Sequence, residues 1–185
     1  MSRPCFFSDQ SIIDRSQPPS FQSAIQNALI AQLHVHNYER WFGASAGNVA
    51  PGLLNSLTPF TITSGGSAGV FGTPIQVFNG TETPVQSFAK LFDFHRLQIA
   101  GISQTGPVFW HIVIADSSGG ATSYAQAVAM GNYTEIIAVL TVPAIPFEIM
   151  SIRHPAGTQL WANLATSFAG SANLNFFVGI HEYAK

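Results

Sequence analysis

Two stretches of the chain match the G-x-S-x-G string that surrounds the nucleophilic serine of many hydrolases. Ser45 lies between Gly43 and Gly47, and Ser67 lies between Gly65 and Gly69. In those enzymes the serine follows a strand and begins a helix, whose backbone N–H groups stabilise an oxyanion. Here both strings lead into Gly-rich, Pro-rich or strand-like sequence, and a chain full of small residues produces them by chance. We therefore predict no catalytic residues.

The pair His34 and His36 places two imidazoles on one face of a predicted strand. Zinc requires at least a third protein ligand. No candidate lies at a diagnostic spacing, so we predict no metal site and leave the role of His34 and His36 open. The remaining histidines that could supply a ligand are His95, His111, His154 and His181.

The densest group of ionisable residues contains Asp93, His95 and Arg96. Asp93 and His95 share a face of the predicted strand, where they can form a charge-assisted pair or an acid–base dyad. A dyad needs a cleft and a further reactive group, and ion-pair networks also gather titratable residues. We interpret this group as structural. No phosphate loop, dinucleotide fingerprint or CxxC pair is present, which indicates no cofactor, and the single cysteine, Cys5, excludes an intramolecular disulfide.

The composition is poor in charge. Charged residues make up 9% of the 185 residues, against about 25% in typical soluble domains. Surfaces with so few charges tend to associate, so burial against neighbouring subunits is expected. The net charge is −2 and the seven Lys and Arg residues are scattered, which argues against binding nucleic acid. No window predicts a membrane-spanning helix or a signal peptide, so we expect assembly in a cytoplasm.

After Leu33 the chain consists of short segments rich in β-branched and aromatic residues, divided by Gly, Pro, Asn and Ser. This pattern is typical of an antiparallel sandwich or barrel, and no long helix separates the segments. The sequence thus predicts an all-β fold, a jelly-roll-like antiparallel β-sandwich. The nine predicted strands lie near residues 33–42, 58–63, 70–78, 90–102, 108–116, 134–142, 147–154, 159–168 and 174–183.

Residues 1–32 differ from the rest. Pro18 and Pro19 precede Ser20, a plausible N-cap for a short helix whose apolar residues have helical spacing. We predict an N-terminal arm over 1–32 that contains one short helix, and a β-sandwich domain over 33–185.

Two predicted strands carry information about burial. In 159–168, Leu160 and Leu164 share one face while Asn163 lies on the other, which indicates a half-buried strand interrupted by Trp161. Between residues 108 and 115 both faces are apolar apart from His111, which predicts a strand that lies centrally or packs against another subunit on its outer side. Either alternative implies a sheet that is covered on both sides.

The C-terminal run from Leu174 to Tyr183 has an aromatic residue, a glycine two positions later and a final aromatic residue. It resembles the last strand of trimeric jelly rolls of the tumour-necrosis-factor and C1q type, which runs close to the threefold axis. The resemblance implies a homotrimer interface formed by Phe177, His181 and Tyr183. Phe176, Val178 and Ile180 alternate with these residues and should point into the core.

Residues 155–162, taken with this ending, are also similar to β-sandwich structural proteins of tailed bacteriophages, including capsid decoration proteins. The resemblance covers about the last thirty residues. It implies a non-enzymatic virion protein, a decoration (cement) or minor capsid component on the capsid surface, whose partners are itself and other capsid proteins. A receptor- or glycan-binding head of a phage fibre or spike is an alternative, and a small esterase or glycosidase is a second.

Overall fold

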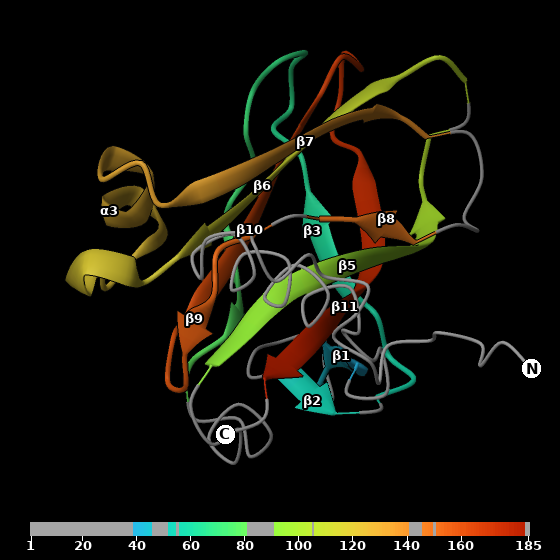
Figure 1. Cartoon of the computed structure of the whole chain (residues 1–185). Coiled ribbons are helices and arrows are strands. Elements are labelled where there is room, and N and C mark those ends of the chain that lie inside the picture. The colour runs from blue at the N-terminus through green and yellow to red at the C-terminus, as the bar shows by residue number, and fades with distance from the viewer. Residues whose placement is uncertain are drawn as a thin grey trace, which may run out of the picture. The chain divides into compact units, whose positions relative to one another are not determined.

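The structure is a computed structural model, and it describes residues 39–45, 52–54, 56–80, 91–104, 106–140, 146–149 and 151–183. These residues form two antiparallel β-sheets with very little helix, which confirms the predicted all-β sandwich (Figure 1). The predicted arm over 1–32 with its short helix, His34, His36 and Cys5 all lie outside the described residues.

The first sheet has seven strands built around β11 (Asn173–Tyr183). One edge of β11 pairs with β5 (Leu91–Ile102), and its other edge pairs with β3 (Phe60–Thr63) and then with β1 (Glu39–Ala44). Three short strands complete the sheet, with β2 on β1 and the other two on β5. They are β2 (Gly52–Leu54), β8 (Phe147–Glu148) and β9 (His154–Pro155).

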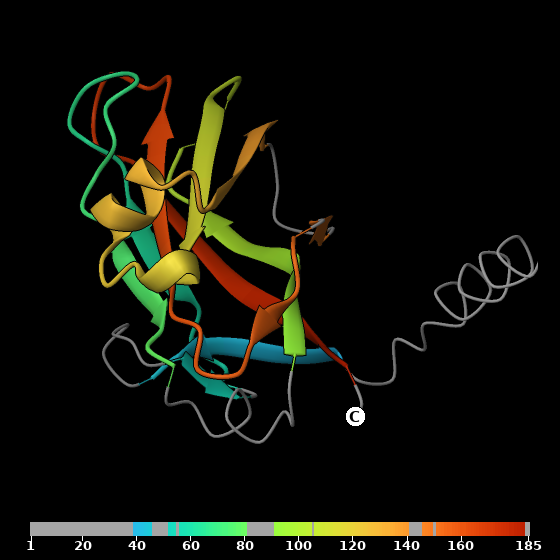
Figure 2. The same ribbon diagram turned by 60° about the vertical axis from the view of Figure 1, so that its left-hand side comes forward.

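The second sheet has four strands in the order β4-β10-β6-β7. The two central strands, β10 (Leu160–Thr166) and β6 (Phe109–Asp116), pair along seven positions. Their outer neighbours are β4 (Ile75–Phe78) on β10 and β7 (Tyr133–Val139) on β6. Figure 2 shows the two sheets facing each other, with the helical segment beside the second sheet.

The core lies between the sheets and is rich in aromatic side chains. Phe42 and Phe78 meet edge to face with ring centroids 4.9 Å apart, so a strand from each sheet contributes to one contact. Phe60 and Phe176 lie 5.5 Å apart within the first sheet. Such pairs are favourable beyond the apolar area they bury. Other large side chains with at most 1% exposure include Phe92, Phe94, Leu97, Trp110, Ile112, Leu160 and Leu164.

Strand β11 places alternate side chains on opposite faces, as the sequence predicts. Phe176, Val178 and Ile180 have at most 1% exposure and belong to the core, which confirms that part of the prediction. On β5 the core positions change from even to odd residue numbers. This change follows from a shift in the register between β5 and β11. Gly179 pairs with Arg96 and the next residue, Ile180, pairs with Phe94, which leaves His95 as the extra residue of a β-bulge.

The prediction that β10 is half-buried is wrong, because every residue of this strand is buried. Its outer face is covered by a short helix, α3 (Tyr124–Ala129), that the sequence analysis missed. Ser123 caps this helix by accepting a hydrogen bond from the backbone of Gln126. Trp161 thereby joins a second apolar cluster that contains Ala115, Ala121, Tyr124, Ala127 and Val128.

Other boundaries differ from the prediction. The single strand predicted over 147–154 consists of the two short strands β8 and β9, and the strand predicted over 70–78 begins only at Ile75. The glycine-rich connection over 64–69 is hydrogen-bonded to its surroundings, since Gly69 donates its backbone N–H to the Thr166 carbonyl. Strand β2 and the 3₁₀ helix η3 (Ser118–Gly120) were not anticipated.

Replacement of Phe176 by alanine should destabilise the protomer strongly. The side chain is fully buried, and truncating a buried phenylalanine costs about 3–5 kcal/mol through lost transfer energy and the cavity left behind. Urea unfolding followed by circular dichroism measures the change in the free energy of unfolding. Phe177→Ala is the control on the opposite face, and an equal loss in both variants would contradict the core assignment.

Candidate functional sites

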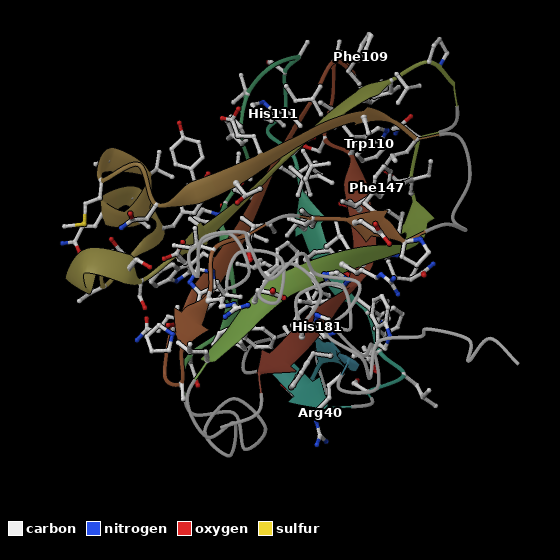
Figure 3. All side chains as sticks on the ribbon, viewed as in Figure 1. Arg40, Phe109, Trp110, His111, Phe147 and His181 are labelled. Atoms are coloured by element: carbon white, nitrogen blue, oxygen red, sulfur yellow. The ribbon has the colours of Figure 1, made fainter. Side chains whose placement is uncertain are left out.

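Three groups of described side chains on the outer faces of the sheets are candidate sites. For each sheet, we call the face that points away from the other sheet its outer face. The histidine cluster, Asp93, His95 and His181, lies on the outer face of the seven-stranded sheet. The apolar strip (Phe109, Ile137 and Val139) and a pocket lined by two tyrosines lie on the outer face of the four-stranded sheet. In Figure 3, His181 is separated from Phe109 and His111 along the sandwich.

The histidine cluster forms because β5 and β11 are neighbours. His181 pairs directly with Asp93 across the two strands, and His95, two residues from Asp93 on β5, lies on the same face. The rings of His95 and His181 are stacked with centroids 4.7 Å apart and an interplanar angle of 30°. The potential ligand atoms of the three residues all lie within 4.8 Å of one another. His181 is 2% exposed and Asp93 is 9% exposed.

The sequence predicts only part of this cluster. The spacing of Asp93 and His95 puts them together, and the structure does the same, but no spacing in the sequence adds His181. Arg96, which the sequence grouped with them, forms an ion pair with Glu148 of β8 at 3.1 Å. This pair is partly exposed, so its contribution to stability is of the order of 1 kcal/mol or less.

The three residues of the predicted trimer interface have different environments. Phe177 lies half-buried on the outer face, where its ring covers Gly43 of β1; a Cβ at Gly43 would come within 2.9 Å of that ring. His181 is buried within the histidine cluster. The side chain of Tyr183 lies outside the described residues. The interface itself stays a prediction.

A second buried histidine links the two sheets. His154 of β9 points toward Asp116 of β6, with 3.8 Å between Nδ1 and Oδ1, and both side chains are almost fully buried. Asp116 also accepts a hydrogen bond from the backbone N–H of Ser118. Burial lowers the pKa of His154, and this effect outweighs the attraction of Asp116 and Asp93, which raises it. The sequence analysis considered His154 only as a metal ligand and missed this pair.

The apolar strip lies where β6 meets β7. Phe109 pairs with Val139, and His111, two residues further along β6, pairs with Ile137. The exposed fractions are 57% for Phe109, 65% for Ile137 and 46% for Val139. Strand β6 lies centrally in its sheet, as one of the two predicted alternatives has it, and α3 covers one end of its outer face. Coverage of the remaining exposed part by another subunit stays a prediction.

A pocket of about 250 Å³ separates this strip from α3. The hydroxyl of Tyr124 hydrogen-bonds with the side chain of Asn163, and burial raises the pKa of Tyr124, so the hydroxyl stays protonated at neutral pH. At the margin of the pocket, Oε1 of Glu135 lies 3.5 Å from Nε2 of His111. The lining residues are Phe71, Val113, Tyr124, Val128, Tyr133, Glu135 and Asn163.

The two serines of the G-x-S-x-G strings occupy different settings. Ser67 is exposed in the turn that follows β3, and no helix begins between it and β4. Ser45 is half-buried directly after β1, and the residues that follow it are not described. Neither position reproduces, within the described residues, the strand–serine–helix arrangement of a nucleophile elbow.

Comparison with known proteins adds no relative: no family model matches this chain, and a search of curated proteins gives no match. Among the described residues, no helix is both long and apolar enough to cross a membrane.

The buried pair of His154 and Asp116 should make stability depend on pH. Because the folded-state pKa of His154 lies below its ordinary value of about 6.5, the unfolded chain takes up a proton at this residue more readily. Its contribution to stability is present above about pH 6.5 and is lost as the pH falls toward the lower folded-state pKa. Urea unfolding at pH 7.5 and pH 5 should therefore show a smaller loss on acidification for His154→Gln than for the wild type.

His111→Gln is the matched control, since His111 is half-buried beside Glu135 on the outer face. It should lose as much stability on acidification as the wild type. An unchanged pH dependence in His154→Gln would mean that other groups account for the acid sensitivity.

Proposed function

We propose that this chain is a non-enzymatic structural subunit of a closed assembly, and that the assembly is a virion surface on which the protein acts as a capsid decoration or minor capsid component. Its work is to bury apolar area between neighbouring protein subunits. The partners are further copies of itself, as a homotrimer, and other capsid proteins.

The order of the strands supports a jelly-roll arrangement. From β3 to β11, successive strands fall alternately in the two sheets, with two exceptions: β6 and β7 are both in the four-stranded sheet, and β8 and β9 both pair with β5 in the seven-stranded sheet. The resulting orders, β3-β11-β5-β8 and β4-β10-β6-β7, are those expected of two interlocking Greek keys. A sandwich of this kind is common in viral capsids, but the arrangement also hosts unrelated functions.

The apolar strip is the observation that carries the proposal. Phe109, Ile137 and Val139 adjoin one another on an outer face, and each is about half exposed or more. The chain as a whole has only 9% charged residues to keep such a surface in solution. A contiguous apolar patch of this kind loses its unfavourable contact with water when another protein covers it.

The outer face of the seven-stranded sheet suits the homotrimer contact. Its central strand, β11, presents Phe177 next to Gly43, and the described ionisable groups on this face include the histidine cluster with Asp93 and the partly exposed ion pair of Arg96 and Glu148. The amide of Asn175 accepts a hydrogen bond from Thr61, and Asn173 does the same for Thr63, so these polar groups are already paired. We assign this face to contacts between copies and the apolar strip to other proteins of the shell.

The mass of the native assembly tests self-association. Native mass spectrometry and sedimentation at low micromolar concentration should give a trimer for the wild type. Phe177→Ala should remain folded but lose the trimer, because it removes an aromatic anchor from the interface. A wild-type monomer, or a trimer that persists in Phe177→Ala, would contradict the interface.

The apolar strip is tested by a pair of matched substitutions. Ile137 and Ile152 have the same exposed fraction of 65%, but Ile152 lies in the connection between β8 and β9. Ile137→Asp should lower the binding of an apolar fluorescent probe, and of capsid shells that carry no copy of this chain, while Ile152→Asp should leave both nearly unchanged. If Ile137→Asp and Ile152→Asp lower probe binding and shell binding equally, the apolar strip is not the contact surface for other shell proteins.

The tyrosine-lined pocket supports glycan binding as a second candidate function. Aromatic rings beside a carboxylate and an amide are the groups that stack on and hydrogen-bond to sugars, and Tyr133 is exposed next to Glu135. A glycan array probed with the wild type and Tyr133→Ala tests this candidate. Glycan binding requires at least one glycan that the wild type binds and Tyr133→Ala does not. If the wild type binds no glycan on the array, the structural role is the better account.

A further inference from the structure

We propose that Asp93, His95 and His181 bind one divalent transition-metal ion, with Zn²⁺ as the best fit. The donors are two imidazole nitrogens and one carboxylate oxygen, and their potential ligand atoms all lie within 4.8 Å of one another. Two histidines with one carboxylate form a set of three protein ligands that Zn²⁺ and other first-row ions accept. Water fills the remaining coordination position.

The distances require only a small adjustment. Bonds of about 2.0–2.2 Å in a tetrahedral site place neighbouring ligand atoms about 3.3 Å apart. The ligand atoms therefore need to approach by at most about 1.5 Å, which rotation about the side-chain torsions supplies. The rings of His95 and His181 are stacked with centroids 4.7 Å apart, so the same torsions must also turn the rings until their in-plane nitrogen lone pairs converge on the ion.

The backbone holds the three ligands in place. Asp93 and His181 are directly paired on neighbouring strands, and His95 occupies the bulge one step along β5. Asp93 and His95 are two residues apart, so the alternation along β5 puts both side chains on one face, and the bulge at His95 lies next to the pair of Asp93 and His181. His181 and Asp93 are buried and His95 is half-buried, so an ion at this position would be largely shielded from solvent.

The donor types decide which ion the cluster selects. Ca²⁺ and Mg²⁺ prefer six or more oxygen ligands, and this cluster offers a single carboxylate. Imidazole nitrogen suits Zn²⁺, Cu²⁺, Ni²⁺ and Fe²⁺. An ion at this position would join the two longest strands of the sheet, so its binding should stabilise the fold.

The test uses Zn²⁺ alone with the full-length chain after treatment with a chelator. Equilibrium dialysis and a thermal melt should show one ion per chain and a higher melting temperature. His95→Ala should lower the affinity at least 100-fold and abolish the shift, and Asp93→Asn should act in the same direction. Substitution by Co²⁺ should give the visible absorption of a tetrahedral site in the wild type and not in His95→Ala.

Two controls keep the test specific. His111→Ala, which removes a histidine beside Glu135 on the other sheet, and the double variant His34→Ala/His36→Ala should both keep the wild-type affinity. Loss of the ion in either control, an ion retained by His95→Ala, or absence of binding at 100 micromolar Zn²⁺ would overturn the proposal. Phe177→Ala should still bind one ion per chain, so failure of the trimer and failure of the metal site are separate outcomes.

Discussion

Strand β11 pairs along both of its edges, and most of the seven-stranded sheet depends on those contacts. Ten of its residues are in register with β5, while β3 and β1 share its opposite edge. The alternation of its side chains then divides the molecule, with Phe176, Val178 and Ile180 in the core and Phe177 and His181 on the outer face. The fold, the histidine cluster and the predicted subunit contact all rest on this one strand.

The sequence predicts this part of the fold well because the signal is local. Alternation along a strand depends on neighbouring residues only, so the positions of β3, β5, β6, β10 and β11 are close to those expected. Helix α3 was missed because its six residues are too few for a clear helical period, although Ser123 is a regular N-cap. That omission is also why Trp161 looked like an exception to a half-buried pattern.

The candidate sites were harder to predict because each depends on pairing between distant segments. Asp93 and His95 are two residues apart, and their common location follows from the sequence. His181 joins them only through the register of β5 with β11, and His154 meets Asp116 only because the two sheets face each other. No spacing rule contains that information, so motif spacing indicates neither the addition of His181 to the cluster nor the pairing of His154 with Asp116.

The position of β11 in the chain also affects how the protein folds. This strand follows all of its partners, and its contacts span long separations, as in the hydrogen bond between Thr61 and Asn175, which are 114 residues apart. Topologies dominated by such distant contacts fold slowly, on the scale of about milliseconds to seconds. Before β11 pairs with β1, β3 and β5, the edges of these strands that face β11 in the folded protein have no partner in the sheet. The yield of folded protein is therefore set by competition between the docking of this last strand and association of those open edges with other chains.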